Sequence, residues 1–172
     1  FLLIEDYFLH RLTGEYVTEG SLATSTCYWN FRTRQWWPEM LEVLEVRPEQ
    51  LPQCRESGEA VGKLRPEAAA ELGLSPETVV CTGALDQACG AIGVGNIRPG
   101  IFSENTGAAL AICATVNHPI LDPGDQMPCH YHGIPGLYML HTFTGGGIVL
   151  KWFRDEFARM ELGVSATSGL DA

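Results

Sequence analysis

Basic residues are scarce in this sequence, and their scarcity limits the kinds of molecule that the protein can bind. Its 172 residues contain 11 Lys and Arg against 21 Asp and Glu, which gives a formal net charge of −10 at pH 7. A surface of this sign repels the phosphates of nucleic acids. Trp36-Trp37 near Arg32 and Arg34 could stack on bases, but with this charge we expect them to pack a short strand and turn. No nucleic acid is therefore expected as a partner.

Long apolar runs and paired cysteine motifs are also missing. No apolar run approaches the ~20 residues that a membrane-spanning helix needs, and Phe1-Leu2-Leu3-Ile4 lacks the basic residues that begin a signal peptide. We therefore expect no membrane contact and a cytoplasmic location. The six cysteines form no CxxC pair, which predicts buried free thiols rather than a disulfide framework.

Apolar periodicity predicts helices and strands along a chain long enough for one domain or for parts of two. The predicted helices are residues 1–12, 39–46, 66–72, 87–94 and 148–162, the first and third ending at Gly14 and Gly73. The predicted strands are residues 28–31, 62–64, 79–80, 101–103, 108–115, 129–132 and 137–143. We expect Val79-Val80 to be buried, and the last helix to bury Ile148, Val149, Trp152 and Phe153. Residues 48–58 are predicted to be a connector, and 163–172 a loop.

The stretch 79–110 holds the residues that point to chemistry. Asp86-Gln87 stands at the start of a helix that carries Gly90 and Gly93 on one face. Glycines within a helix cost about 1 kcal/mol each relative to Ala, which suggests that a ligand or another backbone comes close. Asn105-Thr106-Gly107 then forms a turn that offers a hydroxyl and backbone amides. A carboxylate near such a turn could hold an alcohol beside a phosphate.

Each feature of this kind also has a structural explanation. Asp86 could be the N-cap of its helix, where Asp is favoured, and Asn105-Thr106-Gly107 could be an ordinary hairpin turn. Gly145-Gly146-Gly147, before the last helix, could bind an anion or let the helix lie close to the sheet. Cys129-His130-Tyr131-His132 contains metal-ligand residue types without a second pair at ligand spacing, so we expect no metal site there.

Four segments, in this order, resemble the FGGY carbohydrate kinases, which include xylulokinases, ribulokinases, gluconokinases and glycerol kinases. They are residues 6–16 (DYFLHRLTGEY), 83–95 (GALDQACGAIGVG), 105–110 (NTGAAL) and 145–155 (GGGIVLKWFRD). The resemblance implies an α/β fold of the actin-like ATPase, ribonuclease H-like type, present in part and spanning the junction of two lobes. Residues 1–97 would end the N-terminal, sugar-binding lobe, and residues 98–172 would begin the C-terminal, nucleotide-binding lobe.

The resemblance also implies roles for four residues. Asp86 matches the family's catalytic base, and Gln87 matches a residue that hydrogen-bonds a substrate hydroxyl. Thr106 and Gly107 match contacts to nucleotide phosphate. The implied activity is transfer of the γ-phosphate of ATP, with Mg²⁺ bridging the nucleotide phosphates, to a hydroxyl of a sugar or polyol of the pentulose, hexulose or gluconate class.

The chain departs from the family pattern at two positions and in extent. Asn105 stands where many members have glycine. Glu19 stands where the family has aspartate, which weakens any inference of a polar role at that position, and we expect residues 17–26 to serve helix packing through Ser and Ala. The family's N-terminal phosphate loop, first sugar-binding loops and later adenosine-binding Gly-Gly segment have no counterpart in the sequence. We therefore expect the middle of a kinase, inactive as an isolated chain.

Two other functions stay open at this point. A folded fragment could catalyse nothing and serve as an interaction module, for instance by forming a homodimer through exposed inter-lobe surface. The glycines at positions 90, 93 and 95 suggest a dinucleotide-binding motif, and such a motif would indicate an NAD(P)-dependent oxidoreductase. Their order is the reverse of the dinucleotide fingerprint, and they lie in or at the end of the helix rather than before it.

Overall fold

The computed structural model describes residues 1–124, 126–158 and 163, and it is a mixed α/β structure. Its helices are α1 (Ile4–Thr13), α2 (Gly20–Thr24), α3 (Pro38–Val43), the 3-10 helix η1 (Pro48–Gln50), α4 (Pro66–Leu72), α5 (Asp86–Gly93) and α6 (Gly147–Phe157). Its strands are β1 (Val17–Glu19), β2 (Trp29–Asn30), β3 (Gln35–Trp36), β4 (Gln53–Arg55), β5 (Ala60–Lys63), β6 (Val79–Cys81), β7 (Phe102–Thr106), β8 (Ala109–Val116), β9 (Cys129–Tyr131) and β10 (Tyr138–Gly145).

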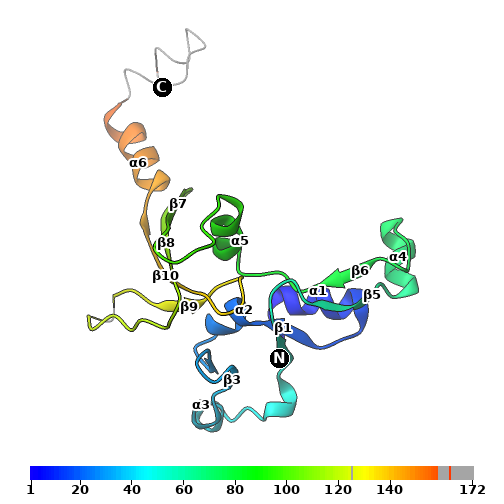
Figure 1. Cartoon of the computed structure of the whole chain (residues 1–172). Helices are drawn as coiled ribbons and strands as arrows, with labels where there is room; N and C mark the ends of the chain where they lie inside the picture. The colour runs from blue at the N-terminus through cyan, green and yellow to red at the C-terminus, as the bar shows by residue number, and fades with distance from the viewer. Residues whose placement is uncertain (125, 159–162, 164–172) are drawn as a thin grey trace.

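An antiparallel sheet with the strand order β7-β8-β10-β9 forms the larger part of the fold (Figure 1). Strands β8 and β10 pair over their full length, from Val116 opposite Tyr138 to Ala109 opposite Gly145. Helix α5 packs against this sheet, and its two buried alanines form a core cluster with Cys113 and Met139. The predicted sheet around the 105–107 segment is therefore confirmed. The small residues of α5 let its backbone lie close to the strands.

Glycine ends two helices as predicted. Gly14 follows α1 with φ +89° and Gly73 follows α4 with φ +66°, a left-handed conformation in which glycine carries no side-chain penalty. Helix α4 has the predicted bounds, and α5 begins one residue before the predicted start.

A buried carboxylate organises the segment that joins β1 to α2. The side chain of Glu19 is 1% exposed and caps α2, because it accepts the backbone N–H groups of Ser21 (2.8 Å) and Leu22 (2.7 Å). It also accepts the hydroxyls of Ser21 (2.6 Å) and Ser57 (2.7 Å). Glu19 therefore has a polar role, which the departure from the family pattern did not indicate. Its longer side chain still reaches both amides of the first helical turn.

The aromatic hairpin β2–β3 packs on the start of α2 rather than presenting its rings for stacking. Trp29 is buried with Ala23 and Tyr131 in a second core cluster. Arg34 pairs with Glu56 at 2.7 Å and lies over the Tyr131 ring. These contacts confirm the predicted packing role of the hairpin.

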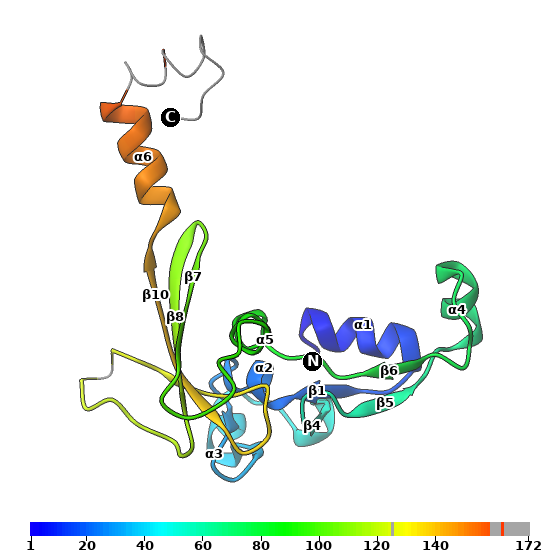
Figure 2. The same ribbon diagram turned by 45° about the horizontal axis from the view of Figure 1, so that its top comes forward.

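Burial is where the expectations from the sequence fail most. Strand β6 forms, but Val79 is 56% exposed. No residue of α6 is buried, and Trp152 is 56% exposed, so the predicted buried stripe is wrong. Figure 2 shows α6 extending away from the other described elements, which leaves its apolar side chains without cover in this part of the chain. The predicted end of this helix and the 163–172 loop lie almost wholly outside the described residues.

The cysteines and one strand also differ from expectation. All six cysteines are free, but three are exposed, one is half-buried and only Cys113 and Cys129 are buried. Residues 53–55, predicted as part of a connector, form β4, which pairs in parallel with β1. None of the described helices is long and apolar enough to cross a bilayer.

Replacing Glu19 by Ala should lower the free energy of unfolding by about 3 kcal/mol, because two buried N–H groups and two hydroxyls lose a charged acceptor. Urea unfolding followed by circular dichroism measures this loss. Glu49→Ala, at an exposed position of η1, is the matched control and should change stability by less than about 0.5 kcal/mol. Equal effects of the two substitutions would contradict the role assigned to Glu19.

Gly20→Ala and Gly93→Ala should have opposite effects on stability. A Cβ at Gly20 would lie 2.6 Å from Cδ1 of Tyr131 and 3.1 Å from Cη2 of Trp29, and such overpacking costs about 1–3 kcal/mol. A Cβ at Gly93 would meet no atom within 4 Å, so alanine should stabilise α5 by up to about 1 kcal/mol. Thermal unfolding of the two variants beside the parent chain tests this, and a more stable Gly20→Ala variant would refute the packing described.

Candidate active site

Asp86 is the first residue of α5 and is exposed. The N-cap is Leu85, so the interpretation of Asp86 as the N-cap is wrong. One carboxylate oxygen, Oδ1, accepts the backbone N–H of Gln87 at 2.7 Å. No ion pair of Asp86 forms within the described residues. The carboxylate is therefore available to a ligand.

The start of α5 is held in place by Ser21 of α2. The backbone N–H of Leu85 donates to Oγ of Ser21 at 2.8 Å, and this hydroxyl donates to Glu19 at 2.6 Å. A hydrogen bond between residues 64 positions apart thus fixes the residue before Asp86. Because the partner carboxylate is itself buried, the position of Asp86 is coupled to the core of the fold.

A cavity of about 800 Å³ opens beside Asp86 and Gln87. Its aromatic lining comes from Trp29, Phe31, Trp37 and Phe143, and its polar lining includes His130 and His141. Apolar walls with a few placed polar groups are typical of sites for small molecules. The cavity lies where the β2–β3 hairpin, the start of α5 and strands β9 and β10 come together.

Burial is the main influence on both cavity histidines. It lowers the pKa of His130 to about 4, assisted by the proximity of His141. It also lowers the pKa of His141, which the nearby Asp86 carboxylate partly offsets. Both imidazoles are therefore neutral at pH 7. Burial raises the pKa of Cys113, and the negative charge of Asp86 raises it further.

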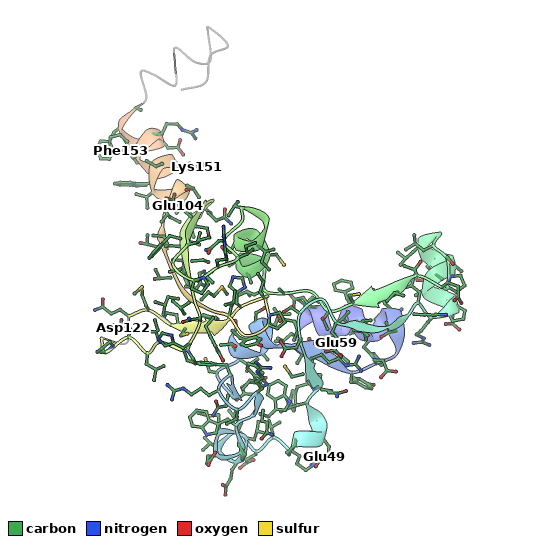
Figure 3. All side chains as sticks on the ribbon, in the orientation of Figure 1. Glu49, Glu59, Glu104, Asp122, Lys151 and Phe153 are labelled. Carbon is green, nitrogen blue, oxygen red and sulfur yellow. The ribbon has the colours of Figure 1, made fainter. Side chains whose placement is uncertain are left out.

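Gln87 also lines a second cavity, of about 190 Å³, between α5 and β7. Asn105 and Glu104 of β7 line the other side of this cavity, and Figure 3 shows Glu104 close to the start of α6. The structure thus brings Gln87 near the 105–107 segment. Gly90 faces the same cavity, and a Cβ there would meet no atom within 4 Å. No other described part of the chain therefore approaches Gly90 closely enough to require a glycine there.

The bend between β7 and β8 lies at residues 107–108, because Asn105 and Thr106 belong to β7. The predicted position of the turn is therefore too early by two residues. The hydroxyl of Thr106 donates to Glu104 at 2.5 Å, and the N–H of Gly107 donates to the carbonyl of Ala109 at 2.8 Å. Both groups are exposed at the surface. A phosphate would have to replace these partners to use either donor.

The triglycine before α6 serves close packing. The N–H of Gly147 donates to the carbonyl of Gly107 at 2.9 Å. A Cβ at Gly147 would lie 2.5 Å from that carbonyl oxygen, and a Cβ at Gly146 would lie 2.7 Å from the backbone nitrogen of Leu110. Of the two interpretations left open by the sequence, the structure supports the one in which the glycines let the backbone approach the β7–β8 bend.

Residues 129–131 of the predicted strand form β9 with alternating burial, whereas His132 lies just beyond the strand and is buried like Tyr131. Within the described residues, no group of three or more His, Cys, Asp or Glu side chains could hold a metal ion. The glycines at positions 90, 93 and 95 lie in α5 or just after it. They cannot form the turn before a helix that a dinucleotide fingerprint requires.

The sequence did not reveal the two cavity histidines as site residues. The sequence predicts only that His130 and His141 lie on two separate strands, residues 129–132 and 137–143. Cross-strand register places them together, because His130 is opposite Met139 and His141 follows Met139 by two residues on β10. Residues two apart on a strand share a face, so a correct pairing of β9 with β10 would have been the signal.

Comparison with known proteins places this geometry in a family. The model of the N-terminal domain of the FGGY family of carbohydrate kinases matches residues 1–93. The gluconokinase of Bacillus subtilis is 30% identical over 168 residues, which cover 98% of this chain and 33% of that protein. The autoinducer-2 kinase of Yersinia enterocolitica is 31% identical over 172 residues, covering 98% of this chain and 32% of that protein.

A solved structure agrees with these matches. The ligand-bound xylulose kinase of Lactobacillus acidophilus superposes with a TM-score of 0.84 at 31% identity, covering 95% of this chain and 34% of that one. The chain thus spans about a third of the length of the curated relatives it matches. Its elements form part of an actin-like, ribonuclease H-like α/β fold. The chain belongs to the FGGY family of carbohydrate kinases.

Proposed function

We propose that this chain carries the catalytic base and part of the substrate site of an ATP-dependent carbohydrate kinase. The observation that supports this proposal best is the Asp86 carboxylate, which is exposed, lacks an ion pair within the described residues and lines the cavity of about 800 Å³. The acceptor would be a hydroxyl of a sugar or polyol of the pentulose, hexulose or gluconate class. The names of the relatives, gluconokinase, autoinducer-2 kinase and xylulose kinase, support this class.

Asp86 acts as general base in this proposal. A sugar hydroxyl is a poor nucleophile at neutral pH, so a carboxylate within hydrogen-bond reach accepts its proton as the new O–P bond forms. The amide of Gln87 orients the substrate by hydrogen bonding to a hydroxyl. Ser21 is a positioning residue, because it holds the N–H that precedes Asp86.

The nucleotide side of the site is assigned to the β7–β8 bend. ATP, as its Mg²⁺ complex, supplies the phosphoryl group when it is bound. The hydroxyl of Thr106 is exposed and can turn from Glu104 to a phosphate oxygen, and Gly107 leaves room for a phosphate beside it. We keep the lobe boundary at residues 97–98, just before the turn in which Gly100 has φ +86°. A reducing cytoplasm remains the location proposed for this enzyme.

Asp86→Asn should abolish most of the activity of a chimera in which this chain replaces the matching segment of the Bacillus subtilis gluconokinase. Loss of the base should lower kcat by roughly 10²–10⁴-fold, measured by coupled ADP release with gluconate as substrate. Asp155→Asn, which removes an exposed partner of Arg154, is the control and should leave kcat within about twofold. An active chimera that is insensitive to Asp86→Asn would contradict the proposal.

The isolated 172-residue chain should show no sugar-dependent ADP formation, because about two thirds of the length of its relatives has no counterpart in it. A coupled assay with ATP, Mg²⁺ and a panel of ketoses and gluconate tests this. Turnover above a protein-free reaction would refute the expectation.

A non-catalytic role is the second candidate, and it is favoured by the uncovered apolar side chains of α1 and α6. Such faces mark contact surfaces. Self-association of the isolated chain into a homodimer, seen by light scattering, would support this role. It would not replace the kinase proposal for a longer protein that contains the chain.

A further inference from the structure

We infer that His130 and His141 form a subsite for a neutral hydroxyl group of a polyol in the cavity beside Asp86, and that this pair helps to select which polyol binds. The inference rests on the proposed function, because it assigns the cavity to the acceptor of that reaction. It adds two residues that neither the family motifs nor the sequence pattern pointed to.

The two histidines lie side by side on neighbouring strands. Their ring centroids are 5.5 Å apart in an edge-to-face arrangement, and both rings line the cavity that Asp86 and Gln87 line. His141 is opposite Cys113 in the β8–β10 pairing and is 9% exposed. Asp86 is near enough to influence its titration, yet the two side chains form no ion pair.

Both rings carry an unsatisfied nitrogen. The Nδ1 of His130 and the Nε2 of His141 are buried and have no hydrogen-bond partner among the described residues. His132 also has a buried Nε2 without a partner, but its Nδ1 accepts the backbone N–H of Ile134 at 3.0 Å. A ring nitrogen of His10 and one of His118 also lie within hydrogen-bond distance of a partner. A half-turn about the Cβ–Cγ bond exchanges nitrogen and carbon positions, so either ring can present a nitrogen to a ligand. Buried polar groups are rarely left unpaired, which points to a ligand as the partner.

The charge state of the pair selects the chemistry of that ligand. Because burial keeps both imidazoles neutral at pH 7, each offers one donor and one acceptor, the complement of a hydroxyl. An anionic group would gain no ion pair from them and would be repelled by Asp86. Arg32 also lines the cavity, but it belongs to the β2–β3 hairpin rather than to the sheet that carries the histidines.

The cavity walls fit the same kind of ligand. Trp29 and Phe143 supply apolar surface against which the carbon backbone of a polyol can lie, and Phe143 stands next to the His141 ring with centroids 6.2 Å apart. Few polar groups in an apolar cavity give orientation and specificity to a small molecule.

The test uses the 172-residue chain and long-range ¹H–¹⁵N spectra of its imidazoles. Titration with D-xylulose should move the ring resonances of His130 and His141 and leave those of His118 in place, whereas inorganic phosphate should move neither cavity histidine. His141→Phe and His130→Phe should each weaken the apparent affinity for D-xylulose by about tenfold, and His118→Phe, the matched control, should leave it within about twofold. The spectrum of the unsubstituted chain answers the question even if a phenylalanine variant does not fold.

The outcomes separate this inference from the proposed function. If D-xylulose moves the backbone resonances of Asp86 and Gln87 but neither imidazole, the histidine subsite is refuted and the kinase proposal stands. If phosphate moves the cavity imidazoles, the claim of a neutral ligand is refuted. If no resonance responds to D-xylulose, the subsite is refuted as well, and the Asp86→Asn chimera remains the separate test of the kinase proposal.

Discussion

The buried hydrogen-bond chain from Glu19 through Ser21 to Leu85 is the constraint on which the candidate site depends. Glu19 caps α2, the Ser21 hydroxyl donates to it, and that hydroxyl in turn accepts the N–H of Leu85, the residue before Asp86. A carboxylate that is 1% exposed needs the N–H and hydroxyl donors that Ser21, Leu22 and Ser57 supply. The helix that presents Asp86 is therefore fixed to the first third of the chain as well as to the sheet beneath it.

The side chains that line the cavity of about 800 Å³ come from elements that are distant in sequence. The hairpin β2–β3 contributes aromatic rings, α5 contributes the carboxylate and the amide, and strands β9 and β10 contribute the histidines. Asp86 is exposed at the start of α5. The histidines are neutral at pH 7 because burial lowers the pKa of each imidazole. A base next to neutral hydrogen-bonding groups suits a ligand that presents hydroxyl groups to them.

Local signals in the sequence predicted local structure well. Helix α4 was predictable from an alanine-rich run between a proline and a glycine, and the β7–β8–β10 order from alternating segments joined by turn residues. Burial was not predictable, because it depends on which distant elements cover a face, as the exposed Val79 and Trp152 illustrate. Strand β4 was missed because its pairing with β1 is non-local. Asp86 and Gln87 came from the family resemblance, whereas the His130–His141 pair required the strand register.

A crystal structure of the chain with bound D-xylulose tests the central claim most directly. If the isolated chain binds the sugar too weakly, the same experiment is done with a longer kinase that contains the chain. The account predicts a ligand hydroxyl within about 2.6–3.2 Å of the Asp86 carboxylate, in the cavity bounded by the aromatic hairpin and the sheet. A sugar bound elsewhere, with Asp86 facing only solvent, would contradict the assignment of Asp86 as the base.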